Sequence, residues 1–342
     1  MAAQKHCFRR IAAFLLVLFA VLQLLSAALK PKCILSSLSN EQPDSLDYIV
    51  LGDSESYSSV SPMELWEKYG FAGFDCGIGG QKIQDTYYLL QEILKVQNPK
   101  VILLETNLLF RNQTAGTVTE ELADRIFGEL VYIYQYHDIW EKLIFPHLAD
   151  KAESAMADTY NGMPIYTNIK GYTGGAYVHV TSSVKQIGKL QRIFLDKITE
   201  LCKDQNIQLI LYSAPSPVNW SFEEHNGIAQ YARENGLVYL DLNLNTQKIG
   251  IDWETDTRDS GDHLNIYGVV KTTAYLGAYL KEHTSLTDHR SEAEYAGWRE
   301  RLIEYRTAIG STADEDEQEE GTGIWDYSTK RTEYFAQTNA EP

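Results

Sequence analysis

Four short polar segments of the chain carry side chains that could together carry out acyl transfer. They are Gly52-Asp53-Ser54, Gly77-Ile78-Gly79-Gly80, Glu105-Thr106-Asn107 and a segment at 259–265 that reads DSGDHLN. A nucleophilic serine needs an imidazole that accepts its proton, a carboxylate that orients the imidazole, and donors that stabilise the oxyanion. Ser54, His263 and a nearby aspartate could supply the first three groups, and the glycine and asparagine segments could supply the donors.

Buried strands could position these side chains. Each of the first three polar segments directly follows an apolar run that is typical of a buried strand. The runs are Tyr48–Leu51, Phe71–Cys76 and Val101–Leu104, and two more lie at 207–212 and 238–242. Stretches with helical spacing of apolar residues lie between them. This alternation predicts an α/β protein, a three-layer α/β/α sandwich with a parallel sheet. Because ligands gather at the carboxyl ends of parallel strands, the polar segments are expected to meet there.

Each polar segment also has a simpler interpretation. Asp53 or Ser54 could cap a helix, and the glycines could form a turn. Asn107 could be a loop residue, and His263 a surface residue before a helix. The order of the segments, and their placement after successive strands, favours a common site.

From Asp47 to Leu280 the chain resembles the SGNH/GDSL hydrolase superfamily, whose motifs follow this order of segments. In that family the serine is the nucleophile, and its backbone amide, a glycine amide and an asparagine side chain form the oxyanion hole. The resemblance implies a flavodoxin-like sheet, Ser54 as nucleophile and His263 as base. It also implies that Ser54, Gly80 and Asn107 form the oxyanion hole.

The chain departs from the family pattern in two segments. Where the family often has Gly-x-Asn-Asp, this chain has Glu105-Thr106-Asn107-Leu108. The family aspartate usually lies three residues before the histidine, at a position that Ser260 occupies here. The orienting carboxylate must therefore come from another position.

Two aspartates compete for that role. Asp262 is adjacent to His263, and consecutive side chains diverge in extended backbone. Asp259 can fold back if Gly261 adopts backbone angles that other residues avoid. We therefore expect Asp259 to orient His263, with Asp262 as the alternative. Asp262 could instead cap a helix that begins near Leu264 or Asn265.

An apolar stretch at Ile11–Leu29 contains 19 residues without a charge. A membrane-spanning helix needs about 20 apolar residues, and a signal-peptide core about 7–15. Length therefore favours a retained single-pass anchor, with residues 1–10 in the cytoplasm and the globular domain outside the cell membrane. Small residues at 26–28 leave secretion after signal-peptide cleavage as the alternative.

Composition excludes several classes of function. The net charge is −17, and the first 32 residues contain basic but no acidic residues, so the remaining chain is more acidic still. Such a body has no general affinity for nucleic acid. The histidines form no His-Glu-x-x-His or similar cluster, and no glycine-rich loop is followed by lysine. The sequence therefore indicates neither a metal nor a cofactor.

The expected organisation is a linker at 30–45, an SGNH-like domain at 46–310 and an acidic tail at 311–342 that should be disordered. An aromatic-rich insertion at about 112–185 interrupts the domain, either as a lid or binding loop or as a helical cap that buries its own aromatics.

The resemblance extends to membrane-anchored enzymes that modify cell-envelope polymers, such as polysaccharide O-acetyltransferases and the D-alanyl transfer proteins of teichoic acid. It implies an extracytoplasmic serine esterase or O-acyltransferase that acts on an acylated glycan. It also implies that other envelope-modification proteins are possible partners. The alternative is a catalytically inactive binding or assembly protein on the same scaffold. A Ser54–His263 pair within about 3 Å would favour the enzyme.

Overall fold

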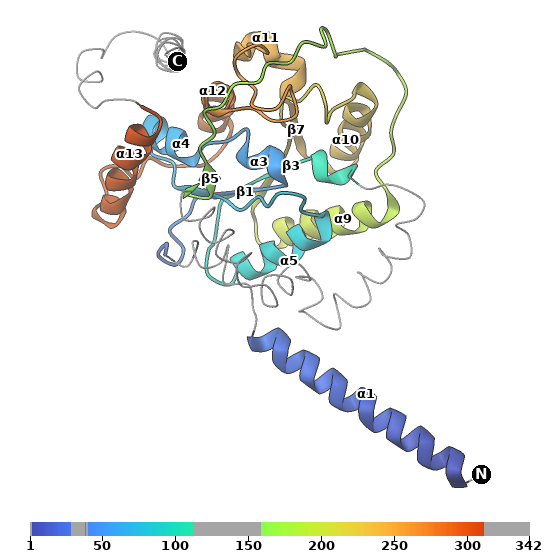
Figure 1. Cartoon of the computed structure of the whole chain (residues 1–342). Helices are drawn as coiled ribbons and strands as arrows, with labels where there is room; N and C mark the ends of the chain where they lie inside the picture. Colours follow the sequence, from blue (N-terminus) through green and yellow to red (C-terminus); the bar gives the residue numbers. More distant parts are fainter. Residues whose placement is uncertain (1, 29–37, 39, 112–158, 311–342) are drawn as a thin grey trace. The chain divides into compact units, whose positions relative to one another are not determined.

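The computed structural model of the chain describes residues 2–28, 38, 40–111 and 159–310 (Figure 1). The chain divides into two units, Met1–Ser36 with Asn112–Ala155, and Ser37–Arg111 with Met156–Pro342. The acidic tail and the first part of the expected insertion, 112–158, lie outside the described residues.

In the first unit, the described residues form one long helix, α1 (Ala2–Ala28). Its window His6–Leu24 has a mean hydropathy of 2.0, and none of that window is buried. At about 1.5 Å per residue, 19 residues span about 28 Å, close to the ~30 Å hydrocarbon core of a bilayer. The helix is therefore long and apolar enough to cross a membrane or to act as a signal anchor.

The second unit is built on a five-stranded parallel sheet with the order β2-β1-β3-β6-β7. The strands are β1 (Tyr48–Leu51), β2 (Gly73–Asp75), β3 (Val101–Glu105), β6 (Gln208–Ser213) and β7 (Val238–Asp241). Every residue of β1 and β3 is buried, which explains why both read as continuous apolar runs. All five predicted strands are present.

Helices cover both faces of the sheet (Figure 1). On one face, residues of β1, β3 and β6 share a core with helices α4 (Pro62–Tyr69) and α12 (Ile266–His283). On the other face lie α5 (Ile83–Ile93), α9 (Lys189–Asp204) and α10 (Phe222–Asn235), of which α5 packs against α9. The predicted α/β/α sandwich is confirmed.

Strand order sets the place of the site. The chain runs from β1 to β2 on one side and then returns to β3 on the other side of β1. This reversal creates a topological switch point between β1 and β3, the usual place for a ligand site in a sheet of this kind. The segments that begin with Ser54 and Asn107 leave the sheet at this point.

A hairpin covers the outer edge of β2. Its strands, β4 (Thr159–Tyr160) and β5 (Met163–Pro164), are joined by Asn161 and Gly162, whose φ angles of 52° and 89° suit a tight two-residue turn. The Asp75 amide donates to the Asn161 carbonyl at 2.9 Å, and the Asn161 side chain donates to the Gly73 carbonyl at 3.2 Å.

The residues after this hairpin, 165–188, form an irregular strap that is hydrogen-bonded to the loop at 253–266. Lys170 donates its amide to Thr257 at 2.9 Å, and Tyr172 donates to Trp253 at 2.8 Å. This part of the expected insertion is therefore an integral part of the unit that contains the sheet.

Helix α13 (Ala296–Ala308) is the last helix among the described residues of the second unit. Trp298 from α13 and Tyr295 just before it pack against Trp66 of α4, with ring centroids 4.9 and 5.7 Å away. The helix is thereby attached to the same face of the sheet as α4.

Candidate active site

Ser54 begins a short helix, α3 (Ser54–Tyr57), and only Gly52 and Asp53 lie between this helix and the end of β1. The Asp53 carboxylate caps this helix by accepting the Glu55 amide at 2.9 Å. Gly52 has no room for a side chain, since a Cβ there would lie 2.7 Å from the Cβ of Glu105. The close approach of β1 and β3 thus fixes the turn that presents Ser54.

A continuous hydrogen-bonded chain joins Ser54, His263 and Asp259. The Oγ of Ser54 lies 2.8 Å from Nε2 of His263, and Nδ1 of His263 lies 2.7 Å from Oδ2 of Asp259. The other carboxylate oxygen of Asp259 accepts the backbone N–H of His263 at 2.6 Å. A serine, an imidazole and a carboxylate in this arrangement can transfer the serine proton to the ring and stabilise the resulting charge.

The loop before His263 folds back through two residues in the left-handed region. Ser260 has a φ of 66° and Gly261 a φ of 92°. The strap fixes this loop, since the Ser260 amide donates to the Lys170 carbonyl at 2.8 Å. Gly261 adopts a positive φ, as expected. The positive φ of Ser260 was not predicted from the sequence.

Asp262 occupies a different position. Its Oδ2 lies 3.8 Å from Nδ1 of His263, beyond hydrogen-bond distance, and its Oδ1 accepts the side-chain amide of Asn219. The expectation that Asp262 might cap the following helix is wrong. Asn265 caps α12, because its side chain accepts the amides of Tyr267 and Gly268, and Asp262 lies too far before the helix.

Asn107 lies beside the Ser54 turn, at the start of the helical turn η1 (Asn107–Leu109). Its side-chain Nδ2 donates to Oδ2 of Asp53 at 3.0 Å. A carboxamide nitrogen carries two N–H groups, so this bond orients the group and leaves the second N–H for another acceptor. Asp53 therefore positions Asn107 as well as capping α3.

The glycine turn at 77–80 also lies beside the end of β1, since the Ile78 amide donates to the Gly52 carbonyl at 3.3 Å. A Cβ on Gly77 would lie 1.8 Å from Oγ of Ser56, so only glycine fits there. Gly80 is exposed and has a φ of 78°. Donation from the amides of Gly80 and Ser54 to an oxyanion stays a prediction.

Several buried carboxyl groups surround the nucleophile, and the sequence-based interpretation gave no role to Glu55 and Glu105 and only that of a possible helix cap to Asp53. Burial raises the pKa of Asp53, which the Glu55 amide, Arg111 and Asn107 partly offset. Burial and the Asp53 charge raise the pKa of Glu105. Burial, Glu105 and Asp53 raise the pKa of Glu55. The sequence did contain one indication of a role for Glu105, because this acidic residue directly follows the apolar run of a strand.

These carboxyl groups have different partners. Asp53 lies 2.9 Å from Nη1 of Arg111. Glu105 accepts backbone amides with both oxygens, from Asn107 at 2.8 Å and from Ala214 at 3.3 Å. Glu55 accepts one hydrogen bond at Oε1, from Asn219, while its buried Oε2 has no hydrogen-bond partner among the residues that the structure describes.

A pocket opens between the residues that follow β3 and those that follow β6. Glu55 and Glu105 form part of its wall, with Asn107 and Phe110 on one side and Asn219 and Trp220 on the other. Because Glu55 follows Ser54 directly, the pocket lies against the nucleophile turn.

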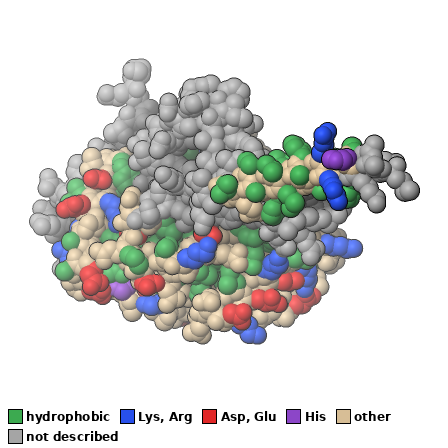
Figure 2. Space-filling view, turned by 90° about the horizontal axis from the view of Figure 1, so that it is seen from below, with side chains coloured by type: hydrophobic (Ala, Val, Ile, Leu, Met, Phe, Trp, Pro, Cys, Tyr) green, Lys and Arg blue, Asp and Glu red, His purple; other side chains and the backbone are tan. Residues whose placement is uncertain are grey.

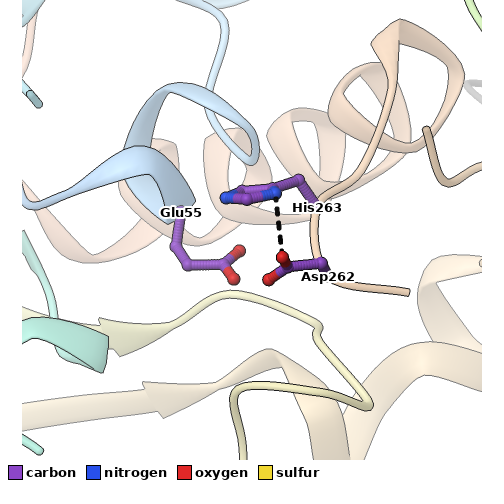
Figure 3. Close-up of side chains that lie close together, drawn as sticks. All are labelled: Glu55, Asp262 and His263. Carbon is purple, nitrogen blue, oxygen red and sulfur yellow. Dashed lines mark ion pairs between the residues drawn. The ribbon is translucent and has the colours of Figure 1, made fainter. Parts of the chain in front are cut away.

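The donor atoms of Glu55, Asp262 and His263 all lie within 4.8 Å of one another, a spacing that could hold a metal ion (Figure 3). Both ring nitrogens of His263 already have partners, Ser54 and Asp259. A metal ion would have to displace one of them, so the described groups fit proton transfer better than metal binding.

Comparison with protein-family models finds no match, and comparison with curated proteins finds none. Among solved structures, the chain is similar to a proposed acylhydrolase from Bacteroides fragilis, with 13% identity and a TM-score of 0.38 over 74% of this chain and 96% of the other. It is also similar to a GDSL-like lipase from Bacteroides thetaiotaomicron, with 12% identity and a TM-score of 0.35 over 69% and 87% of the two chains. At these low scores, the argument for function rests on the geometry of the site.

Proposed function

We propose that the chain is a serine-dependent acyl-ester enzyme of the SGNH/GDSL type, an esterase or an O-acyltransferase. The observation that carries the proposal is the Ser54–His263–Asp259 chain of hydrogen bonds, with distances of 2.8 and 2.7 Å. The alternative is an inactive scaffold protein. It does not explain why an imidazole lies at hydrogen-bond distance from Ser54, which begins a helix at the switch point.

In the proposed reaction, His263 takes the proton of Ser54 as Oγ attacks the ester carbonyl. The second N–H of Asn107 and the amides of Ser54 and Gly80 stabilise the oxyanion of the tetrahedral intermediate. The imidazolium then protonates the leaving alcohol, and an acyl-Ser54 ester remains. Water or a sugar hydroxyl, deprotonated by His263, attacks this ester and releases the acid or the transferred ester.

The proposed setting is the outer side of the cell membrane, with an acylated envelope glycan as substrate and other envelope-modification proteins as possible partners. Support comes from α1, which is long and apolar enough to anchor the chain. Further support comes from the resemblance of the site segments to those of membrane-anchored polymer-modifying enzymes.

The test is covalent labelling of the full-length protein in detergent with a fluorophosphonate probe, followed by peptide mass spectrometry. The adduct is expected on Ser54 and should be lost in Ser54→Ala and His263→Ala. Ser183→Ala is the control, because Ser183 is exposed and lies on the strap. Labelling that persists in Ser54→Ala would refute the assignment of the nucleophile.

A further inference from the structure

We propose that Asp75 is a positioning residue for the oxyanion hole, which holds the glycine turn at 77–80 against the Ser54 helix and holds it more firmly as a carboxylate than as a neutral acid. Turnover should therefore depend on the ionisation of Asp75 as well as on that of His263. This inference rests on the proposed function, because the turn contributes to catalysis only if Gly80 donates to an oxyanion.

The Asp75 side chain joins the two segments that must face each other in the oxyanion hole. Asp75 ends β2 and is 2% exposed. Its Oδ1 accepts the Gly77 amide at 2.7 Å and the Ser56 hydroxyl at 3.1 Å. Ser56 belongs to α3, which begins at Ser54, and Gly77 begins the glycine turn. One carboxyl oxygen thus connects the turn to the helix that carries the nucleophile.

The hydrogen bond from Gly77 fixes the place where the turn begins. The Gln81 amide closes the turn by donating to the Ile78 carbonyl at 2.9 Å, and Gly80 lies inside it. The Ile78 amide makes longer contacts, the shorter of them to Oε1 of Gln81 at 3.2 Å. At 2.7 Å, the bond to Asp75 is shorter than any of these. It is therefore the main constraint on the entry to the turn that positions the Gly80 amide.

The contact between the turn and α3 has no free space around it. A Cβ on Gly77 would lie 1.8 Å from Oγ of Ser56 and 2.9 Å from Oδ1 of Asp75. The Ser56 hydroxyl also lies 2.9 Å from the Asp53 carbonyl, directly before the nucleophile. Because these groups touch one another, a change in the strength of the Asp75 contacts acts on the position of the turn relative to Ser54.

Asp75 can change its charge near neutral pH. Burial raises its pKa to about 7, which the Gly77 amide and the Ser56 hydroxyl partly offset. Its second oxygen, Oδ2, is buried and has no hydrogen-bond partner among the described residues, so a proton can occupy it while Oδ1 keeps both donors. Hydrogen bonds to an ionised acceptor are about twice as strong as those to a neutral one. Protonation therefore leaves both contacts in place and weakens them.

The other titratable groups near Asp75 are neutral at pH 7. They belong to β1, α3, β6 and the residue after β2, and they are Tyr48, Tyr57, Tyr212 and Cys76. Burial raises the pKa of each of them, and the charge of Asp75 raises it further. Among the described residues, no cation shifts the pKa of Asp75, and neither do the buried carboxyl groups Asp53, Glu55 and Glu105. A step in the pH profile that disappears with the Asp75 carboxyl group therefore reports its ionisation.

The kinetic test compares the pH dependence of kcat for methanol release from methyl acetate in the wild type, Asp75→Asn and Asp47→Asn. Asparagine keeps the accepting oxygen without the charge, so it reproduces the neutral acid at every pH. In addition to the His263 ionisation, the wild type should show a ~10-fold rise in kcat centred near pH 7, less than the loss of a whole oxyanion donor would cost. Asp75→Asn should lack this rise and stay at the lower rate, with KM little changed. Asp47 is also buried but precedes β1, at the opposite end of the sheet, so Asp47→Asn should keep the rise.

Ser56→Ala provides a second readout. Its hydroxyl donates to Asp75 and favours the ionised form, so its removal should raise the pKa of that carboxyl group. The midpoint of the rise in kcat should move to higher pH by up to about one pH unit, the scale of a single hydrogen bond. A purely structural role of Ser56 would lower kcat at every pH and leave the midpoint unchanged.

The titration can also be followed without turnover. Cys76-Gly77 is the only Cys-Gly pair in the sequence, so cysteine labelled with ¹³C at the carbonyl and glycine labelled with ¹⁵N select the Gly77 amide by NMR. The full-length protein is kept in detergent, because apolar side chains cover α1 (Figure 2). The Gly77 signal should shift with pH around a midpoint near 7 in the wild type, and this shift should be absent in Asp75→Asn.

The outcomes separate this inference from the proposed function. Profiles of active wild type and Asp75→Asn that differ only by a constant factor would overturn the inference, and so would a Gly77 signal that does not titrate. A change confined to KM would make Asp75 a binding residue and would also overturn it. If the Gly77 signal titrates as expected but no ester is cleaved and Ser54 is not labelled, the proposed function fails while the link between Asp75 and the glycine turn stands.

Discussion

The Asp259→Asn substitution would test the proposed triad most directly. In the structure, one oxygen of Asp259 accepts the His263 backbone N–H at 2.6 Å and the other faces Nδ1 of the ring at 2.7 Å. An asparagine can accept the backbone N–H only with its oxygen, so its NH₂ group must face Nδ1. The ring then accepts at Nδ1 and carries its proton on Nε2, facing Ser54, which is the wrong tautomer for a base.

The expected loss in kcat is ~10²–10⁴-fold, about 3–5 kcal/mol of transition-state stabilisation. The lower part of this range is included because the Asp259 side chain is 34% exposed, so water can partly replace the carboxylate. Asp262→Asn is the matched comparison. Because Asp262 lies 3.8 Å from the ring, its substitution should change kcat less than ~10-fold, well short of a triad replacement.

The assay is methanol release from an ester substrate by both variants and by His263→Ala, with circular dichroism to check folding. His263→Ala should lose at least as much activity as Asp259→Asn, because replacing the base of a catalytic triad usually costs more than replacing the carboxylate that orients it. A large loss in Asp262→Asn, with Asp259→Asn near the wild-type rate, would show that the loop rearranges in the working enzyme and would refute the assignment.

Three further predictions concern the oxyanion hole, stability and topology. Asn107→Ala should lower kcat by ~10²–10³-fold, and an effect on KM alone would make Asn107 a binding residue. Burial raises the pKa of Asp75 to about 7, so the folded state keeps a proton that the unfolded state loses, and the unfolding free energy should fall as pH rises from about 4 to about 7. Asp75→Asn should remove this decline, which amounts to about 3 kcal/mol between pH 5 and pH 8, in urea unfolding at these two pH values; an equal decline in both proteins would contradict it. Protease added to intact cells should leave a fragment that contains α1, whereas soluble protein with a new N-terminus near Leu29 would indicate a cleaved signal peptide.

The sheet could be predicted because strands that are buried on both faces consist almost entirely of apolar residues. The apolar run at Val101–Leu104 specified β3 to within one residue. The strand continues to Glu105 because its carboxyl group accepts amides from the chain beyond β3 and β6, a long-range arrangement that no local pattern records. The hairpin at 159–164 was missed, although Asn161-Gly162 is a strong turn signal, because its strands are only two residues long.

The parts of the site that belong to the four polar segments could be predicted, and the parts supplied by other loops could not. Ser54, Asn107 and His263 lie in three of these polar segments, whose order along the chain is recognisable. Asn219 lies 164 residues from Glu55 along the chain, and only the fold brings them together. The bond between Lys170 and Ser260, which fixes the Asp259 loop, likewise depends on the strap.

The Asn161 turn also bears on how copies of this protein behave when crowded. β2 is an edge strand, and exposed edge strands offer unpaired N–H and C=O groups to neighbouring chains, which promotes aggregation. Asn161 occupies the outward N–H of Asp75 and the outward carbonyl of Gly73, and its own side-chain oxygen accepts from Arg301 at 3.0 Å. With that edge already hydrogen-bonded, β2 cannot recruit a strand from a second copy, and the chain is protected against sheet-to-sheet polymerisation on that side.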